Sequence, residues 1–140
     1  MAISPSGGPI YPSLSVDASC IGNLGRLEFR GVWNEDGRIL FTRGPYAYGT
    51  NNIGEFLALV LGLAYIQQHQ LQCPIYTDSI TALSWVKKKK CRTMLQTDDN
   101  ELTLLIRKAE LWLHNNIWTT SILKWQTHLW GEIPADYNRK

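Results

Sequence analysis

Three carboxylates stand at positions where a charged side chain is unusual. Asp17 interrupts the strand-like segment LSVDASC, Glu55 lies within an apolar helical pattern, and Asp78 ends the strand-like segment CPIYTD. Carboxylates that lie close together repel one another, which raises their pKa values unless a cation is bound. Oxygen ligands of this kind suit Mg²⁺ or Mn²⁺, and two such ions about 4 Å apart can promote phosphodiester hydrolysis. The three residues therefore predict a metal site with that chemistry.

Other catalytic chemistries find less support in the chain. It has no P-loop, no nucleophile elbow and no HExxH motif. Cys20, Cys73 and Cys91 stand at unrelated spacings, without a CxxC pair or a Cys/His cluster, which predicts reduced thiols rather than a zinc site.

The first half of the chain must position Asp17 and Glu55. Alternating strand patterns at residues 14–20, 26–33 and 38–44, joined by short turns, predict an antiparallel meander. A 3.6-residue apolar repeat then predicts a helix from residue 51 or 52 to about 69, with Asn51 as its N-cap. Gly54 is unfavourable within a helix by about 1 kcal/mol relative to alanine, so we expect close approach to the backbone there.

The second half of the chain continues with two strands and three helices. We expect a strand at 73–78, a helix at 79–86 that starts near Ser79, a helix at 98–116 capped by Asp98, a strand at 121–126, a loop at 127–132 and a closing helix at 133–140. This order predicts an α+β fold with a five-stranded mixed sheet, in which the meander is joined to parallel strands and helices flank the sheet.

Length and composition indicate one domain. The 140 residues divide into an irregular arm at 1–12, which holds three prolines, and a folded domain at 13–140. The net charge of +2 does not by itself indicate a nucleic-acid-binding protein. The N-terminus has no signal-peptide pattern, and the longest apolar run, residues 56–66, is about half of a membrane span. We therefore expect a cytoplasmic protein without a membrane partner.

Four segments together resemble a known family. They are VDASCIGNLG (16–25), GTNNIGEF (49–56), IYTDS (75–79) and IPADY (133–137). In this order they resemble the motifs of type 1, bacterial-type ribonuclease H. The resemblance implies a ribonuclease H-like fold, a monomer, and an endonuclease that cuts the RNA strand of RNA–DNA hybrids to leave 5′-phosphate and 3′-hydroxyl ends.

The resemblance also implies roles for individual residues. Two Mg²⁺ ions, replaceable by Mn²⁺, would be held by four carboxylates: Asp17, Glu55, Asp78 and Asp136. The minor groove of the hybrid, where 2′-hydroxyls distinguish RNA, would be bound by Ser19, Cys20, Asn23, Asn51 and Asn52. Thr50 would contact a phosphate of the DNA strand. For Thr50, Asn51 and Asn52, helix capping is the alternative.

Three positions near the motifs are less typical of the family. Its mobile histidine, thought to shuttle protons or help the product leave, has a counterpart in His128, eight residues before Asp136; histidine titrates near neutrality, and an incidental loop histidine is the alternative. Glu132 could replace or assist Asp136. Tyr48 stands where the family often has a phosphate-contacting arginine.

The segment after Asp78 is too short for the extra helix and basic loop with which many family members grip the DNA strand. It does carry Lys87, Lys88, Lys89 and Lys90 after a tryptophan. We expect this run to make a reduced phosphate contact, which would increase the salt dependence of binding. A solvated surface is the alternative.

Three other functions are alternatives to a ribonuclease H. A 3′–5′ exonuclease of related fold would carry a DxE pair on the first strand, whereas Asp17 is followed by Ala18 and Ser19. A catalytically inactive hybrid-binding domain is disfavoured because the carboxylates are retained. A polymerase-associated module is also conceivable, but the short arm favours a free-standing protein or one separated from a small accessory domain.

Overall fold

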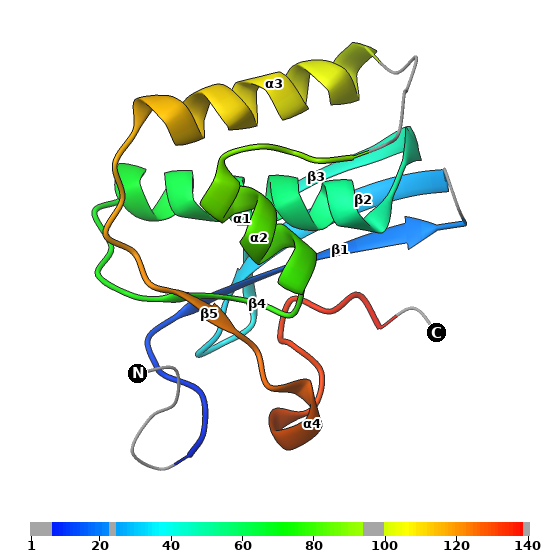
Figure 1. The fold of residues 1–140 in the computed structure, drawn as a ribbon. Coiled ribbons are helices and arrows are strands. Elements are labelled where there is room, and N and C mark those ends of the chain that lie inside the picture. Colours follow the sequence, from blue (N-terminus) through cyan, green and yellow to red (C-terminus); the bar gives the residue numbers. More distant parts are fainter. Residues whose placement is uncertain (1–6, 23–24, 94–99, 139–140) are drawn as a thin grey trace.

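The computed structural model describes residues 7–22, 25–93 and 100–138. In these ranges the chain forms strands and helices in the order shown in Figure 1. They are β1 (Leu14–Ile21), β2 (Gly25–Trp33), β3 (Arg38–Gly49), α1 (Asn51–Gln68), β4 (Ile75–Thr77), α2 (Ile80–Lys88), α3 (Asn100–Asn115), β5 (Ile122–Lys124) and α4 (Thr127–Trp130).

The sheet has the order β3-β2-β1-β4-β5. Strands β1, β2 and β3 pair antiparallel, as the predicted meander requires. Strand β4 pairs parallel with both β1 and β5. The predicted five-stranded mixed sheet is therefore confirmed. Because β1 and β4 are parallel neighbours, their carboxyl ends meet at one edge of the sheet, where sites in such sheets commonly open.

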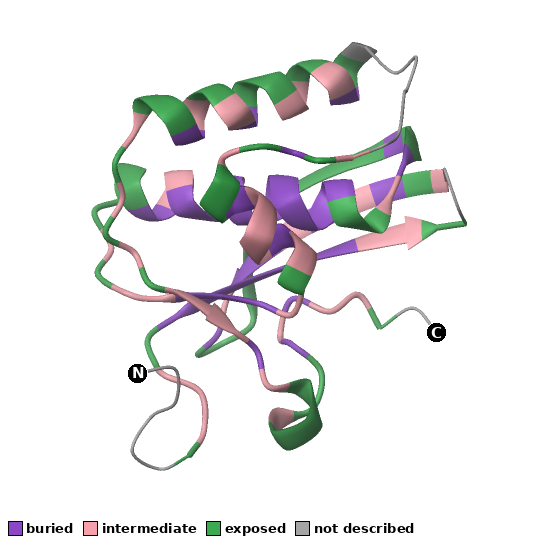
Figure 2. Cartoon of the chain, in the orientation of Figure 1, coloured by how far each residue is buried: buried purple, intermediate pink, exposed green. Residues whose placement is uncertain are grey.

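Helices cover the sheet unequally. Figure 1 shows α1, α2 and α3 on one side of the sheet and α4 with the C-terminal segment on the other. Helix α1 packs directly on β1 and β2, and it also contacts α2 and α3. Most of α1 is consequently buried, as Figure 2 shows. None of the helices in the described ranges combines the length and apolar character needed to span a membrane.

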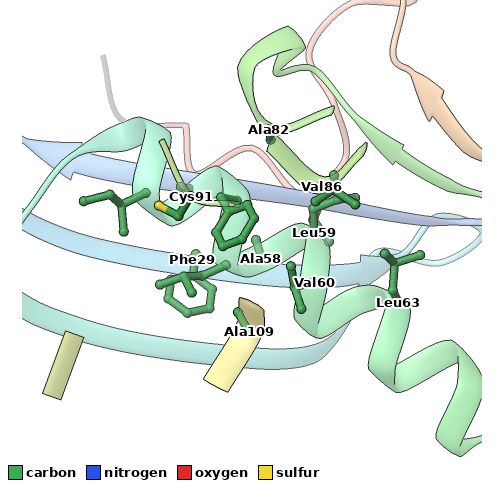
Figure 3. Packing of buried hydrophobic residues seen from close by; sticks show 14 of the residues in the cluster. Phe29, Ala58, Leu59, Val60, Leu63, Ala82, Val86, Cys91 and Ala109 are labelled. Atoms are coloured by element: carbon green, nitrogen blue, oxygen red, sulfur yellow. The ribbon is translucent and has the colours of Figure 1, made fainter. Parts of the chain in front are cut away.

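The main hydrophobic core lies between the sheet and these three helices. Phe29 of β2, Leu59 and Leu63 of α1, Val86 of α2 and Ala109 of α3 all contribute to it (Figure 3). These contacts hold α1, and with it Glu55, against the strands that carry the other candidate ligands.

A second, smaller core is built from aromatic side chains. Tyr76, Trp125 and Ile133 are almost fully buried in it, and Trp130 packs against them. The described part of the N-terminal arm docks here, because the Ile10 amide donates to the Tyr76 hydroxyl at 2.8 Å and Trp130 Nε1 donates to the Gly7 carbonyl at 3.0 Å. This core anchors α4 and the segment that follows it.

The prediction of a closing helix is wrong for residues 133–138, which form no helix. The structure instead places a short helix, α4, in the segment predicted to be a loop. Two physical reasons favour the irregular segment: Pro134 disfavours helical backbone at Ile133, and the carbonyls of Ala135 and Asp136 accept hydrogen bonds from the Arg30 side chain. Ile133 and Ala135 are buried and anchor the segment without a helix.

Other boundaries differ by a few residues. Strand β3 continues to Gly49 instead of ending at residue 44, because Tyr46 is drawn into the core after a register shift. Strands β4 and β5 are shorter than predicted. Helix α2 starts next to Ser79 as expected, and the Ser79 side chain caps it by accepting a hydrogen bond from the Ala82 amide. The predicted cap Asp98 lies outside the described residues.

Candidate active site

The start of α1 is fixed by Thr50 rather than by the predicted cap, Asn51. The Thr50 side chain accepts a hydrogen bond from the Ile53 amide at 3.2 Å, and its backbone is extended, as at a typical N-cap. Asn51 and Asn52 are the first helical residues, and both are exposed. The prediction of Asn51 as the cap was therefore wrong by one residue.

Gly54 brings the first turn of α1 into contact with the sheet. A Cβ atom at this position would lie 2.5 Å from Cδ1 of Leu27 and 2.7 Å from Cβ of Ala18, too close for any larger residue. The close approach predicted from the sequence is confirmed, and its partners are β1 and β2. This contact places Glu55 beside β1.

Strand pairing brings Asp17 and Asp78 together. Leu14 lies opposite Ile75 and Ser15 opposite Tyr76 in the parallel β1–β4 pair. Continuing that register makes Asp17 level with Asp78, which directly follows β4. The turn after Asp78 is ordered because Thr77 Oγ1 accepts a hydrogen bond from the Ser79 amide at 3.1 Å.

The carboxylates of Asp17, Glu55 and Asp78 form one cluster. Each contributes an oxygen, and these three oxygens lie within 4.8 Å of one another. Asp17 and Glu55 are buried, with exposed fractions of 7% and 2%, whereas Asp78 is half-buried. The residues selected from their unusual positions in the sequence are thus brought together from a strand, a helix and a strand end.

Burial and mutual repulsion make this cluster difficult to ionise. Burial raises the pKa of Asp17 from 3.8 to about 6, and the charges of Asp78 and Asp136 add to this increase. The pKa of Glu55 is raised further, to about 11, first by burial and then by its interactions with Asp17 and Asp78. Without a cation, burial therefore favours the protonated forms of Asp17 and Glu55.

The donor set fits a divalent cation. Oε1 of Glu55 is buried and has no hydrogen-bond partner in the part of the chain that the structure describes. A buried acceptor of this kind costs about 1–3 kcal/mol if it stays unsatisfied. Hard oxygen ligands at short separation suit Mg²⁺ or Mn²⁺, which would satisfy the Glu55 oxygen and relieve the repulsion.

Asp136 lies within electrostatic reach of the cluster, although it does not belong to it. Its charge contributes to the raised pKa of Asp17. Its Oδ2 accepts a hydrogen bond from the Asn138 amide at 3.0 Å, and its own amide donates to the Ile133 carbonyl. Glu132, which the sequence offers as a replacement for Asp136, is exposed and also lies outside the three-carboxylate cluster.

Arg30 is a residue near the site that the sequence did not indicate. It lies directly opposite Asp17 in the β1–β2 pair. Its Nε donates to the Ala135 carbonyl at 2.9 Å, and its Nη2 donates to the Asp136 carbonyl at 2.7 Å. In the sequence, Arg30 is one of several alternating polar positions of β2, and its partners are more than 100 residues away, so no local pattern could have identified it.

The other residues predicted to act in the site differ in their exposure and in their contacts. Cys20 Sγ lies 3.3 Å from the carbonyl oxygens of both Gly22 and Gly49, and its single hydrogen is shared between these two acceptors near the ends of β1 and β3. Ser19 is half-buried at the end of β1. Asn23 lies outside the described residues. His128 is exposed on α4.

The lysine run does not form one uniform surface. Lys87 and Lys88 are exposed at the end of α2. Lys89 adopts a left-handed backbone, with Nζ 5.8 Å from the centre of the Trp118 ring. Lys90 pairs with Glu110 at 3.7 Å. Lys89 and Lys90 therefore have partners within the protein, although Lys90, like Lys87 and Lys88, is exposed.

Solved structures share this architecture, although no family model matches the chain. A crystal structure of LC11-RNase H1 in complex with an RNA/DNA hybrid is similar with a TM-score of 0.52 and 16% identity, covering 80% of this chain and 83% of that one. A second structure of LC11-RNase H1, isolated from compost by a metagenomic approach, is similar with a TM-score of 0.51 and 17% identity. The match covers 80% of this chain and 81% of that one. These similarities confirm the predicted fold: the chain has the ribonuclease H fold.

Proposed function

We propose that this protein is a ribonuclease H, an endonuclease that hydrolyses the RNA strand of RNA–DNA hybrids with the help of two divalent metal ions. The observation that carries the proposal is the convergence of Asp17, Glu55 and Asp78 within 4.8 Å on this fold. It is supported by the similarity to LC11-RNase H1, which was crystallised with an RNA/DNA hybrid. The expected products have 5′-phosphate and 3′-hydroxyl ends.

The protein's share of the chemistry is to hold and shield the reacting groups. Asp17, Glu55 and Asp78 are proposed as metal ligands, with Asp136 as the fourth. When bound, Mg²⁺ or Mn²⁺ supplies Lewis-acid stabilisation of the charge that develops on the phosphodiester oxygens. The burial of Asp17 and Glu55 limits competing water and fixes the carboxylates before substrate arrives, so little reorganisation is needed during the reaction.

Recognition of the hybrid is assigned to polar groups beside the cluster. The exposed amides of Asn51 and Asn52 are suited to exchange hydrogen bonds with 2′-hydroxyls and base edges in the minor groove. Ser19, Cys20 and Asn23 are proposed to extend that surface. Capping and substrate binding are compatible at Thr50, whose hydroxyl accepts from Ile53 and keeps its own hydrogen available for a phosphate.

Two further roles concern the periphery of the site. His128 is proposed to shuttle protons or assist product release, consistent with its exposure on α4. Lys87 and Lys88 are proposed to contact phosphates of the DNA strand, whereas Lys89 and Lys90 contribute less because each already has a partner within the protein.

The proposal is tested by substrate choice. End-labelled RNA–DNA hybrid, double-stranded RNA and double-stranded DNA are incubated with Mg²⁺, with Mn²⁺ and with a chelator. We expect internal cuts only in the RNA of the hybrid, abolished by the chelator and by Asp78→Asn. Glu101→Gln, which removes an exposed carboxylate from the start of α3, is the matched control and should retain activity. Comparable digestion of either control duplex would overturn the proposal.

A further inference from the structure

Arg30 connects the strand opposite Asp17 to the C-terminal segment. We propose that Arg30 is a positioning residue that holds Asp136 beside the metal site by binding the backbone of residues 135–136. The inference rests on the proposed function, because it concerns how the fourth carboxylate of that site is kept in place.

The sheet directs Arg30 and Asp17 to the same face. The two residues are paired directly across β1 and β2, and paired residues share a face. Ala18 faces α1, since a Cβ on Gly54 would lie 2.7 Å from its Cβ, and Val16 approaches Gly62 in the same way. Because side chains alternate along a strand, Asp17 and Arg30 point to the opposite face, where the C-terminal segment lies (Figure 1).

Arg30 holds three consecutive residues of that segment. Its Nε and Nη2 donate to the carbonyls of Ala135 and Asp136, at 2.9 Å and 2.7 Å. Its guanidinium carbon lies 4.3 Å from the centre of the Tyr137 ring. Only arginine combines a rigid fork of N–H donors with a planar cation that stacks on an aromatic ring. The contacts therefore require this side chain rather than any positive charge.

The position of the Asp136 carboxylate follows from these contacts. Both of these Arg30 donors, Nε and Nη2, bind main-chain carbonyls. The effect of Arg30 is thus to fix the backbone on which Asp136 is carried. The Asn138 amide then orients the carboxylate by donating to Oδ2. Residues 133–138 form no helix whose hydrogen bonds would fix their backbone. The Arg30 contacts with the Ala135 and Asp136 carbonyls fix it instead.

A double-mutant cycle tests whether Arg30 acts through Asp136. We expect Arg30→Ala to lower kcat for hybrid cleavage by about 10- to 100-fold, the range expected for a small misplacement of a reacting group, while KM changes little. In the Asp136→Asn background, Arg30→Ala should cause no further loss, because the group that it positions is already disabled. Arg38→Ala, an exposed arginine at the start of β3, is the matched control.

Two measurements do not depend on activity. Amide hydrogen exchange of the peptide containing residues 133–138, without metal, should be faster in Arg30→Ala than in Arg38→Ala. Mn²⁺ binding measured by calorimetry should weaken in Arg30→Ala, and not further in the double variant. Arg30→Lys keeps the positive charge but lacks the paired N–H donors of the guanidinium. It should therefore also show faster exchange and weaker Mn²⁺ binding, and it serves as the test variant if Arg30→Ala does not fold.

The outcomes separate this inference from the proposed function. A wild-type protein that leaves the hybrid intact refutes the proposed function, whereas exchange and Mn²⁺ binding still decide the role of Arg30. The inference is overturned if Arg30→Ala and Arg30→Lys leave exchange and Mn²⁺ affinity unchanged, or if the kcat losses of Arg30→Ala and Asp136→Asn multiply in full.

Discussion

Raising the pH of the metal-free protein should destabilise it through the carboxylate cluster. The pKa of Asp17 is raised in the folded state, so between pH 3.8 and about 6 the folded protein holds a proton that the unfolded chain has lost. Stability falls with pH wherever the folded state binds more protons. The contribution of Asp17 is therefore fully present below pH 3.8 and is lost as the pH rises to about 6.

The magnitude follows from the same values. One pKa unit corresponds to about 1.4 kcal/mol, so the increase from 3.8 to about 6 corresponds to a loss of about 3 kcal/mol in the free energy of unfolding. Burial raises the pKa of Glu55 further, so its ionisation also lowers the free energy of unfolding, and this loss continues toward higher pH. A loss of this size is a large fraction of the total stability of a small domain.

Urea denaturation at several pH values measures the effect. With a chelator present, wild type should lose about 2 kcal/mol more than Asp17→Asn between pH 4 and pH 7, because asparagine does not ionise and part of the total of about 3 kcal/mol is already lost at pH 4. Asp36→Asn, in an exposed turn, should resemble wild type. Mg²⁺ should stabilise wild type more at pH 7 than at pH 4. Parallel pH profiles for wild type and Asp17→Asn would refute the electrostatic reasoning.

Three further predictions concern the surroundings of the cluster. In Gly54→Ala, the new Cβ would lie 2.7 Å from Cβ of Ala18. The free energy of unfolding should fall by about 1–3 kcal/mol, as measured by thermal unfolding. Mn²⁺ binding, measured by calorimetry, should weaken because Glu55 is displaced. Replacing Lys87 and Lys88 together by alanine should weaken hybrid binding and reduce the salt slope by about 2, as measured by titrations at increasing salt. His128→Ala should lower turnover while hybrid affinity stays nearly constant.

Each of these predictions has a contradicting result. Unchanged Mn²⁺ affinity in Gly54→Ala would show that the contact with β1 does not position Glu55. For the lysine pair, the control is Lys90→Ala, which should change affinity less because Lys90 is paired with Glu110; equal effects would contradict the assignment. An unchanged rate for His128→Ala across pH 6–9 would remove His128 from the mechanism.

The sequence predicted the sheet, the main helices and the three clustered carboxylates because these features depend on local patterns. Alternation, helical periodicity and a charge in an apolar segment are readable within a few residues. Asp17 and Asp78 stood out in strand-like segments, and Glu55 in a buried helix. Gly54 was informative for the same reason, since its cost within a helix required a compensating contact.

The errors arose where distant partners decide the local structure. Thr50 rather than Asn51 caps α1, because β3 runs on to Gly49 and leaves Thr50 as the extended residue before the helix. The closing helix failed to form because Arg30 binds carbonyls of a segment that follows it by more than 100 residues. No window of neighbouring residues contains the Arg30 contacts, whereas Pro134, which disfavours helical backbone at Ile133, was a local signal against the helix.

The chemistry of the products tests the central claim most directly. Mass spectrometry of RNA fragments released from an RNA–DNA hybrid identifies the ends that each cut leaves. With Mg²⁺, wild type should give internal fragments with 5′-phosphate and 3′-hydroxyl ends, while Glu55→Gln gives none. Fragments that end in a 2′,3′-cyclic phosphate, or fragments that persist in Glu55→Gln, would contradict a metal-dependent hydrolysis built on these carboxylates.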